Sequence, residues 1–173
     1  HGGHFVARYN GQVIFVRHAI TGEKCSIKIT AVNSKIAHAD VVDVLSASAD
    51  RVTPPCKYAG TCGGCDFQHI SSEHQRTLKS HVITEQFSRI AKKDITVEVE
   101  EVGQSVGWRT RAIGTTNRNG KLGFYKSRSH SIAPVDNCLI CVEEMNFSEI
   151  SSRELKGDVR VEISASTTGE RSI

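Results

Sequence analysis

Residues 12–17, QVIFVR, and residues 25–32, CSIKITAV, decide the fold of the N-terminal part of the chain. Both stretches are rich in Val and Ile and alternate in part with polar side chains, which is typical of strands with one buried face. Residues 37–45, AHADVVDVL, repeat this pattern. Turn signals separate the runs: Asn10-Gly11, Thr21-Gly22 and Asn33-Ser34. Because the runs are closely spaced and show no helical period, we predict a small antiparallel barrel over residues 1–50.

A linker and a helix follow this region in the sequence. Pro54-Pro55 can join neither a helix interior nor a central strand, so residues 47–55 are predicted to be a linker. Apolar side chains then recur at helical spacing near residues 72–92: Leu78, Val82, Ile83, Phe87 and Ile90. Ser71 or Ser72 can cap the first turn. The pattern predicts one amphipathic helix of about five turns, and its apolar face needs a partner.

The rest of the chain has mainly strand patterns. Strands are predicted for residues 95–102, 108–116, 122–126, 130–135 and 158–164, and a polar helical stretch for residues 143–155. Asn119-Gly120 lies between two of these runs and indicates a hairpin. The predicted fold class is therefore α+β, mostly β, with a second domain over residues 51–173. Hydrophobic residues at 38% and charged residues at 24% exclude a disordered or collagen-like chain.

Cysteines carry the sharpest chemical signal. Residues 55–65, PCKYAGTCGGC, have the spacing C-x5-C-x2-C, and their glycines allow a loop to direct the sulfurs of Cys56, Cys62 and Cys65 at one centre. Residues 138–141, CLIC, can supply a fourth thiolate. A closed site of four thiolates suits either zinc or an iron-sulfur cluster. Free buried thiols or a disulfide are the alternatives, but three cysteines interspersed with glycine are poorly suited to core packing.

Spacing leaves the choice between zinc and an iron-sulfur cluster open. Structural zinc sites usually present two matched C-x2-C pairs. Cys62 with Cys65 and Cys138 with Cys141 form two such pairs, and that arrangement leaves Cys56 unused. With no secretory signal in the sequence, the compartment is predicted to be reducing.

Basic residues are segregated along the chain. The formal net charge is only +3, yet residues 104–134 contain six Lys or Arg and no Asp or Glu. Such a segment is a candidate phosphate-binding surface, and a solvated face is the alternative. No run of about 18 apolar residues occurs, so we expect no membrane span or membrane partner. The residues form no catalytic constellation, so we expect no catalytic residue in this chain.

Taken together and in order, these motifs resemble the RNA uracil-C5 methyltransferases that act on ribosomal and transfer RNA. The residues that carry the resemblance are Cys56-x5-Cys62-Gly63-Gly64-Cys65-x3-His69, Gln75-x3-Lys79, Gly107-Trp108-Arg109-x-Arg111 and Ser131 to Cys138. Residues 1–23 are similar to the TRAM domain that precedes the cluster in many of these enzymes. The resemblance implies an OB-like RNA-binding barrel, a central domain with a [4Fe-4S] cluster, and a Rossmann-like domain that binds S-adenosylmethionine.

Carried onto this sequence, the resemblance assigns the cluster to four cysteines: Cys56, Cys62, Cys65 and Cys138. It leaves Cys141 spare. The S-adenosylmethionine domain, with its catalytic cysteine and carboxylate, is expected to be absent from these 173 residues. The chain is therefore expected to be the RNA-binding and iron-sulfur part of a longer methyltransferase, inactive in methyl transfer by itself.

The resemblance also implies an RNA partner, either ribosomal or transfer RNA. Six side chains are predicted to contact it, the first four through phosphates and the last two by stacking on an unpaired base: Arg109, Arg111, Lys126, Arg128, Phe67 and His69. We expect a cytoplasmic monomer. The alternative function is a free-standing zinc-binding RNA-binding module without catalysis.

Overall fold

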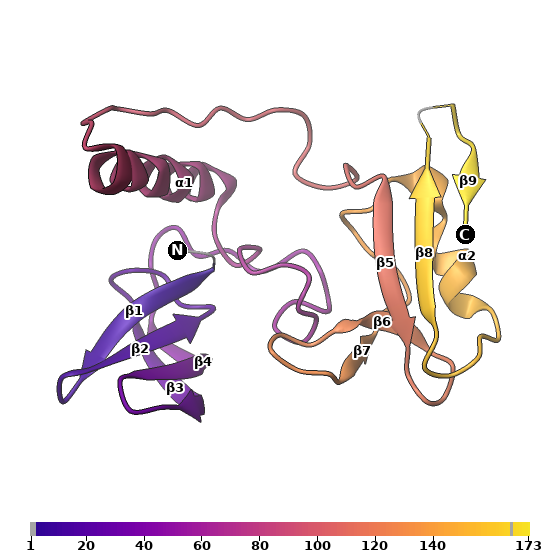
Figure 1. Cartoon of the computed structure of the whole chain (residues 1–173), viewed down its shortest axis with the longest axis horizontal. Coiled ribbons are helices and arrows are strands. Elements are labelled where there is room, and N and C mark those ends of the chain that lie inside the picture. Colours follow the sequence, from indigo (N-terminus) through magenta and orange to yellow (C-terminus); the bar gives the residue numbers. More distant parts are fainter. Residues whose placement is uncertain (1–2, 167) are drawn as a thin grey trace. The chain divides into compact units, whose positions relative to one another are not determined.

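The computed structural model describes residues 3–166 and 168–173 and divides into two compact units (Figure 1). The first unit comprises His1–Pro55 and Asp66–Glu100, and the second comprises Cys56–Cys65 and Glu101–Ile173. The predicted domains divide the chain at residue 50 instead. In the structure the long helix belongs to the first unit, and the cysteine loop belongs to the second.

A four-stranded sheet forms most of the first unit. Its strands are β1 (His4–Tyr9), β2 (Gln12–Arg17), β3 (Lys24–Val32) and β4 (Ile36–Ser46), in the order β1-β2-β4-β3. The three N-terminal strand predictions are confirmed to within one residue at each end. Asn10 and Gly11 join β1 to β2 with φ angles of 47° and 79°, as a two-residue hairpin turn requires.

The prediction of an antiparallel barrel is wrong in the pairing of the central strands. β2 and β4 run parallel, with Val13 opposite Ile36 and Arg17 opposite Asp40. The reason is the path of the chain. β3 runs opposite to β2, and β4 runs opposite to β3 and lies between β2 and β3 in the sheet. Among the described residues β1 and β3 lie at the two edges of the sheet, so no closed barrel is formed.

One face of this sheet holds the core of the first unit. Ile14 and Val16 on β2 pack with Ala37 and Ala39 on β4. The period of two places all four side chains on the same face, as expected for a sheet buried on one side.

The helix α1 (Ser72–Gln86) begins where it is predicted to begin. The Ser71 hydroxyl caps it by accepting a hydrogen bond from the backbone N–H of His74 at 3.3 Å. A π-helical turn, η1 (Phe87–Ala91), extends α1, and Lys92 ends it in the left-handed region with φ 54°. No residue of α1 or η1 is buried, so most of the predicted apolar face stays accessible.

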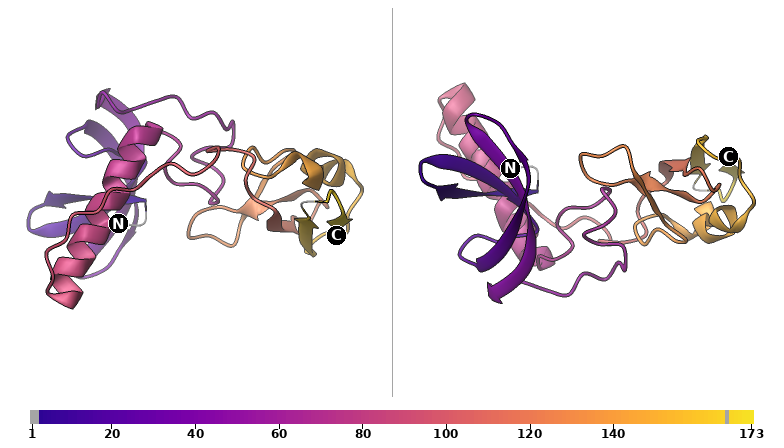
Figure 2. Two further views of the ribbon diagram at one scale, coloured as in Figure 1. Left: turned by 90° about the horizontal axis from the view of Figure 1, so that it is seen from above. Right: turned by 90° about the horizontal axis from the view of Figure 1, so that it is seen from below.

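The predicted strand at residues 95–102 is not formed. Ile95, Val97 and Val99 alternate as half-buried residues, so the pattern of period two is real. This segment runs along α1 instead of pairing with a strand (Figures 1 and 2). The Val99 N–H donates a hydrogen bond to the Ser80 hydroxyl on α1 at 3.0 Å.

A second, antiparallel sheet forms the other unit. It contains β5 (Arg111–Thr116), β6 (Leu122–Tyr125), β7 (Ile132–Pro134), β8 (Arg160–Ala165) and β9 (Arg171–Ser172), in the order β7-β6-β5-β8-β9. The predicted hairpin at Asn119-Gly120 is confirmed, since β5 pairs with β6 across it. The predicted fold class, α+β and mostly β, is confirmed.

Two short helices between β7 and β8 complete the core of the second unit. They are the 3-10 turn η2 (Glu143–Met145) and α2 (Phe147–Ser152). Met145 and Ile150 are fully buried and pack with Ile163 of β8. Among the described residues, no helix combines the length and the apolarity that a membrane span requires.

Candidate metal centre and its surroundings

The structure brings the predicted cysteine loop and the second cysteine segment into the same unit. Cys62 and Cys138 are half-buried and pack against the core that contains Cys141. Cys62 interacts electrostatically with Cys56 and Cys138, and Cys141 interacts with Cys65 and Cys138. The two segments that carry the five candidate cysteines therefore belong to one unit, although they lie far apart in the sequence.

Polar contacts tie the cysteine loop to the chain just before Cys138. The Lys57 ammonium group lies 2.7 Å from the Asp136 carboxylate, and the backbone N–H of Asp136 donates to the Tyr58 hydroxyl at 3.0 Å. The pKa of the Asp136 carboxyl is lowered, mainly by its hydrogen bond from Lys57. These three residues could not be predicted from the sequence, because nothing in it shows which side chains meet across so long a separation.

Gly63 sets how closely the loop approaches the sheet. Its N–H donates to the Tyr125 carbonyl at the end of β6 at 2.9 Å. A Cβ atom at Gly63 would lie 2.6 Å from that carbonyl oxygen, which is too close for any other residue. Glycine is therefore required here for close backbone packing.

Backbone N–H groups point at two of the sulfurs. The Gly64 N–H donates to Cys62 Sγ at 3.4 Å, and the Cys138 sulfur accepts from the N–H groups of Ile140 and Cys141. Such hydrogen bonds favour the thiolate, which is the form of cysteine that binds metal. They also give each C-x2-C segment a local geometry suited to a ligand.

Burial and nearby positive charge shift the pKa values of these thiols in opposite directions. Burial raises the pKa of Cys62. The Cys141 thiol donates a hydrogen bond to the Cys138 sulfur, and this bond lowers the pKa of Cys138 and raises that of Cys141. The positive charge of Arg109 favours the thiolate forms of Cys62 and Cys138.

The donor chemistry fits a metal group bound by thiolates. In the described part of the chain, no three His, Cys, Asp or Glu side chains lie together as they would around a single ion. A four-iron cluster instead binds its four thiolates at separate irons, which is compatible with a wider arrangement. An all-sulfur donor set selects zinc or iron-sulfur clusters over hard cations.

Trp108 and Arg109 lie beside this site. The N–H groups of both residues donate to the Ile140 carbonyl, at 3.0 and 2.8 Å, and Arg109 forms a β-bridge with Cys141. The Arg109 guanidinium lies 5.2 Å from the centre of the Trp108 ring. Trp108 is 54% exposed, so its ring is available as a surface rather than as core packing.

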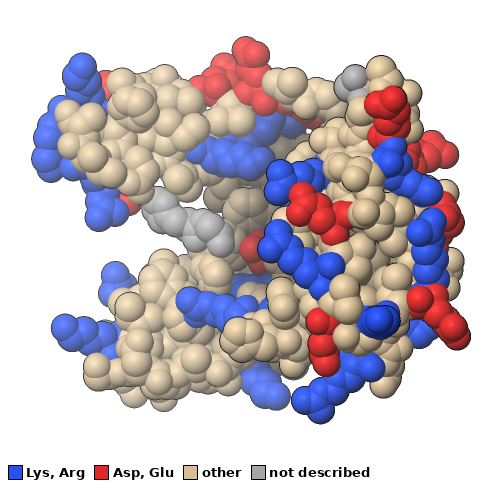
Figure 3. Space-filling view, turned by 45° about the vertical axis from the view of Figure 1, so that its right-hand side comes forward, with Lys and Arg blue, Asp and Glu red and all other residues tan. Residues whose placement is uncertain are grey.

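The other three predicted phosphate contacts differ in their surroundings. Arg111 is exposed and forms an ion pair with Glu162 of β8 at 2.8 Å, a pairing that residues 104–134 alone could not reveal. Lys126 and Arg128 are exposed in the turn that follows β6, and the described residues give them no ion pair. Acidic side chains lie among the basic ones on the face shown in Figure 3.

The two predicted stacking residues belong to the first unit. His69 is only 4% exposed, and its Nε2 lies 3.1 Å from the Ala19 carbonyl. A ring held in this way has no free face for a base, so its role is a structural hydrogen bond. Phe67 is half-buried, and its carbonyl accepts from Gln75 at 3.1 Å.

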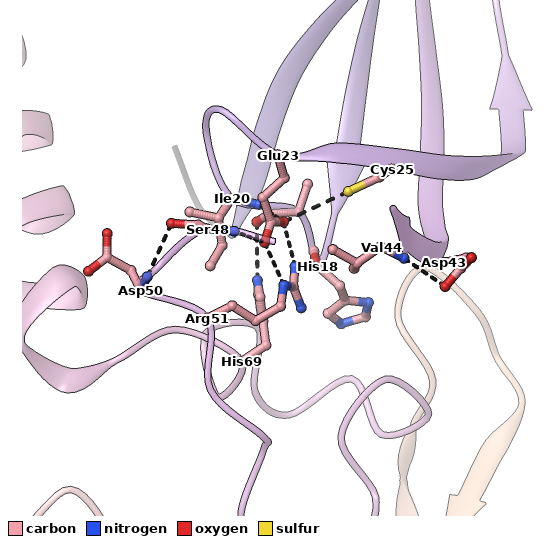
Figure 4. A network of polar contacts seen from close by, with 11 residues as sticks. His18, Ile20, Glu23, Cys25, Asp43, Val44, Ser48, Asp50, Arg51 and His69 are labelled. Carbon is pink, nitrogen blue, oxygen red and sulfur yellow. Dashed lines mark hydrogen bonds and ion pairs between the residues drawn. The ribbon is translucent and has the colours of Figure 1, made fainter. Parts of the chain in front are cut away.

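His69 belongs to a polar network that sequence analysis did not find (Figure 4). Its centre is Glu23, whose side chain is fully buried. Both carboxylate oxygens of Glu23 accept from the Arg51 guanidinium at 2.6 Å, and they also accept from the N–H groups of Ile20 and Ser48. Arg51 in turn donates to the His18 carbonyl at 2.7 Å. The network fastens the chain after β4 to the loop between β2 and β3.

The pKa shifts in this network predict that acid destabilises the first unit. Burial raises the pKa of Glu23, but the hydrogen bonds from Arg51, Ser48 and Ile20 outweigh it and lower that pKa to about 2. Burial lowers the pKa of His18 and of His69. All three groups bind protons more readily in the unfolded chain. The stability of the first unit is therefore highest near neutrality and decreases as the pH is lowered.

Hydrogen exchange of β2 and β4 between pH 7.5 and pH 3 measures this loss. We expect a first decrease of protection below about pH 6.5, from the histidines, and a second below about pH 4.5, from Glu23. Glu23→Gln should remove the second decrease, and β5 and β8 in the other unit serve as the internal control. Equal acid sensitivity of both units would contradict this assignment.

Comparison with known proteins assigns a domain to the first unit. Residues 1–42 match the family model of the TRAM domain. The chain is also similar to proteins described as RNA methyltransferases, and this is the class of protein that it resembles.

Two relatives show how much of the chain is similar to these proteins. An uncharacterized RNA methyltransferase from Streptomyces coelicolor is 39% identical over 96% of this chain and 40% of its own length. One from Listeria monocytogenes serotype 4b is 33% identical over 100% of this chain and 39% of its own length. The chain thus spans about two fifths of these curated relatives.

The fold is similar to that of the Pyrococcus abyssi tRNA (uracil-54, C5)-methyltransferase, solved with S-adenosyl-L-homocysteine. The TM-score is 0.60 over 98% of this chain and 44% of that one, at 18% sequence identity. At this identity the likeness concerns the fold.

Proposed function

We propose that this chain is the RNA-binding and iron-sulfur part of an S-adenosylmethionine-dependent RNA uracil-C5 methyltransferase. A [4Fe-4S] cluster would be held by Cys56, Cys62, Cys65 and Cys138, and the substrate would be ribosomal or transfer RNA. Methyl transfer would need an S-adenosylmethionine domain, so these residues alone bind RNA without modifying it. The protein would act as a cytoplasmic monomer.

The observation that carries this proposal is the meeting of the two cysteine segments within one unit. The cysteine loop contacts Asp136 through Lys57 and Tyr58, and N–H groups point at the sulfurs of Cys62 and Cys138. A bound cluster would fasten the loop to a strand end distant in sequence, where a cross-link restricts the unfolded chain most. The cluster would therefore have a structural role and supply no step of the reaction.

RNA binding has support from both units. The TRAM match covers β1 to β3 and most of β4 in the first unit. In the second unit, Lys126 and Arg128 are exposed in a turn that begins where Gly63 contacts β6. Trp108 and Arg109 add an exposed aromatic ring with a guanidinium group above it, a combination suited to an unpaired base beside a phosphate.

Replacement of Lys126 or Arg128 by Ala is expected to weaken RNA binding by removing a phosphate contact. Each substitution should lower the slope of log Kd against log salt by about 0.7–0.9. Arg111→Ala should have a smaller effect, because Glu162 already compensates part of its charge. Fluorescence anisotropy with a uridine-containing RNA hairpin at several salt concentrations measures both quantities.

Arg153→Ala is the matched control, since Arg153 is an exposed arginine directly after α2 that is paired with Glu149. It should leave affinity and salt slope unchanged. If Lys126→Ala and Arg128→Ala also behave like this control, the basic segment does not contact RNA.

A zinc-binding RNA-binding module is the second candidate function. The observation in its favour is that both C-x2-C segments present N–H groups to their first cysteine, as paired zinc ligands do. The ligands would then be Cys62, Cys65, Cys138 and Cys141. The two candidates differ in whether Cys56 or Cys141 is required.

A further inference from the structure

The ligand set of the proposed cluster leaves one thiol unassigned, and a backbone turn joins its residue to one of the ligands. The second unit contains five cysteines, and four are assigned to the cluster. The fifth, Cys141, is 8% exposed and forms part of the core of the second unit. A small apolar residue would serve that packing equally well. Cys138, one of the four assigned ligands, packs against this same core.

The backbone between the two residues holds them at the separation of a disulfide. The Cys141 N–H donates to the Cys138 carbonyl at 3.0 Å, which closes a four-residue turn. Such a turn keeps its end Cα atoms within about 7 Å, and disulfides span about 4.4–6.8 Å between Cα atoms. Because the turn already sets this separation, little backbone movement separates the reduced from the oxidised pair.

We infer that Cys138 and Cys141 form a redox pair, which closes as a disulfide when the site holds no metal. This inference rests on the proposed function, because a cluster bound by Cys138 blocks the reaction and a zinc site would use both thiols as ligands. The disulfide would keep Cys138 from irreversible oxidation in the metal-free chain. Reduction would return the ligand.

Exposure assigns the order of the two steps. Cys138 is more accessible than Cys141, so the Cys138 thiolate attacks the sulfur of a small-molecule disulfide such as oxidised glutathione and releases one glutathione thiolate. The Cys141 thiolate then attacks the Cys138 sulfur of the mixed disulfide and releases the second. Two protein thiols are oxidised, one glutathione disulfide is reduced, and the two thiol protons leave with the glutathione.

The test uses the metal-free 173-residue chain, oxidised glutathione, alkylation of the remaining thiols, and peptide mass spectrometry. We expect an internal Cys138–Cys141 disulfide as the main product. In Cys141→Ser the glutathione adduct on Cys138 should persist, because no thiol is present to resolve it. Cys25 hydrogen-bonds to Glu23 in the first unit and serves as the control thiol, so Cys25→Ser should not change the product.

Reconstitution with iron and sulfide gives an independent readout. The oxidised chain should take up little iron, and treatment with dithiothreitol should restore uptake to the level of a chain that was never oxidised. A main product that joins Cys138 to another cysteine, or a stable glutathione adduct in the wild type, would overturn the inference. Failure of the never-oxidised chain to bind iron would instead overturn the proposed function.

Discussion

Arg51→Ala is expected to lower the stability of the first unit by about 3–5 kcal/mol, the usual loss when a buried ion pair loses one partner. The Glu23 side chain has no exposed surface, and Arg51 supplies two of its hydrogen bonds at 2.6 Å. The substitution leaves a buried carboxylate with only two backbone donors and the weak Cys25 thiol donor. It also removes the bond from Arg51 to the His18 carbonyl.

Hydrogen exchange of β2 and β4 under native conditions measures this loss within the unit concerned. Arg153→Ala removes an exposed ion pair on α2 and should cost less than about 1 kcal/mol in its own unit. The double variant Arg51→Met with Glu23→Gln should be more stable than Arg51→Ala, because no buried charge is left without a partner. A loss below about 1 kcal/mol in Arg51→Ala would contradict the role given to the network.

Ile163→Ala is expected to lower the stability of the second unit by about 2–5 kcal/mol. Ile163 is fully buried on β8, where its side chain packs with Met145 and Ile150. Removal of three carbon atoms from this core loses their burial and leaves a cavity that the surrounding sheet and helix fill only in part.

Ile113→Ala is the matched control, since Ile113 lies on the neighbouring strand β5 with 40% of its surface exposed. It should cost less than about 1 kcal/mol. Denaturation followed by the fluorescence of Trp108, the single tryptophan of the chain, reports on the second unit. Equal losses for the two variants would mean that the core does not lie on the face of the sheet that Ile163 occupies.

Local patterns predicted the elements of this fold, but not how the elements pair. Alternation of period two located β2, β3 and β4 because each has one face in a core, and Asn10-Gly11 has the conformational freedom that its turn requires. The parallel pairing of β2 with β4 depends on the path of the whole chain. Residues 95–102 alternate like a strand and fail to form one, because α1 lies beside them where a strand would be needed.

The cysteines of the candidate site were found from sequence because their spacing is itself the signal. The contacts that hold the site together were not found, since Lys57 with Asp136 and Arg111 with Glu162 join residues whose sequence neighbours say nothing about them. His69 is a residue for which the sequence pattern suggested a role that its position in the fold does not allow. A histidine beside a cysteine motif suggested an RNA contact, and its burial against the Ala19 carbonyl became visible only in the folded chain.

The metal content of the anaerobically purified chain tests the central claim most directly. Iron, acid-labile sulfide and zinc should be measured in the wild type and in Cys56→Ser, Cys138→Ser and Cys141→Ser, with Cys25→Ser as the control. The account predicts about four irons and four sulfides per chain in the wild type, Cys141→Ser and Cys25→Ser, and loss of both in the other two variants. One zinc per chain that survives Cys56→Ser and disappears in Cys141→Ser would contradict it.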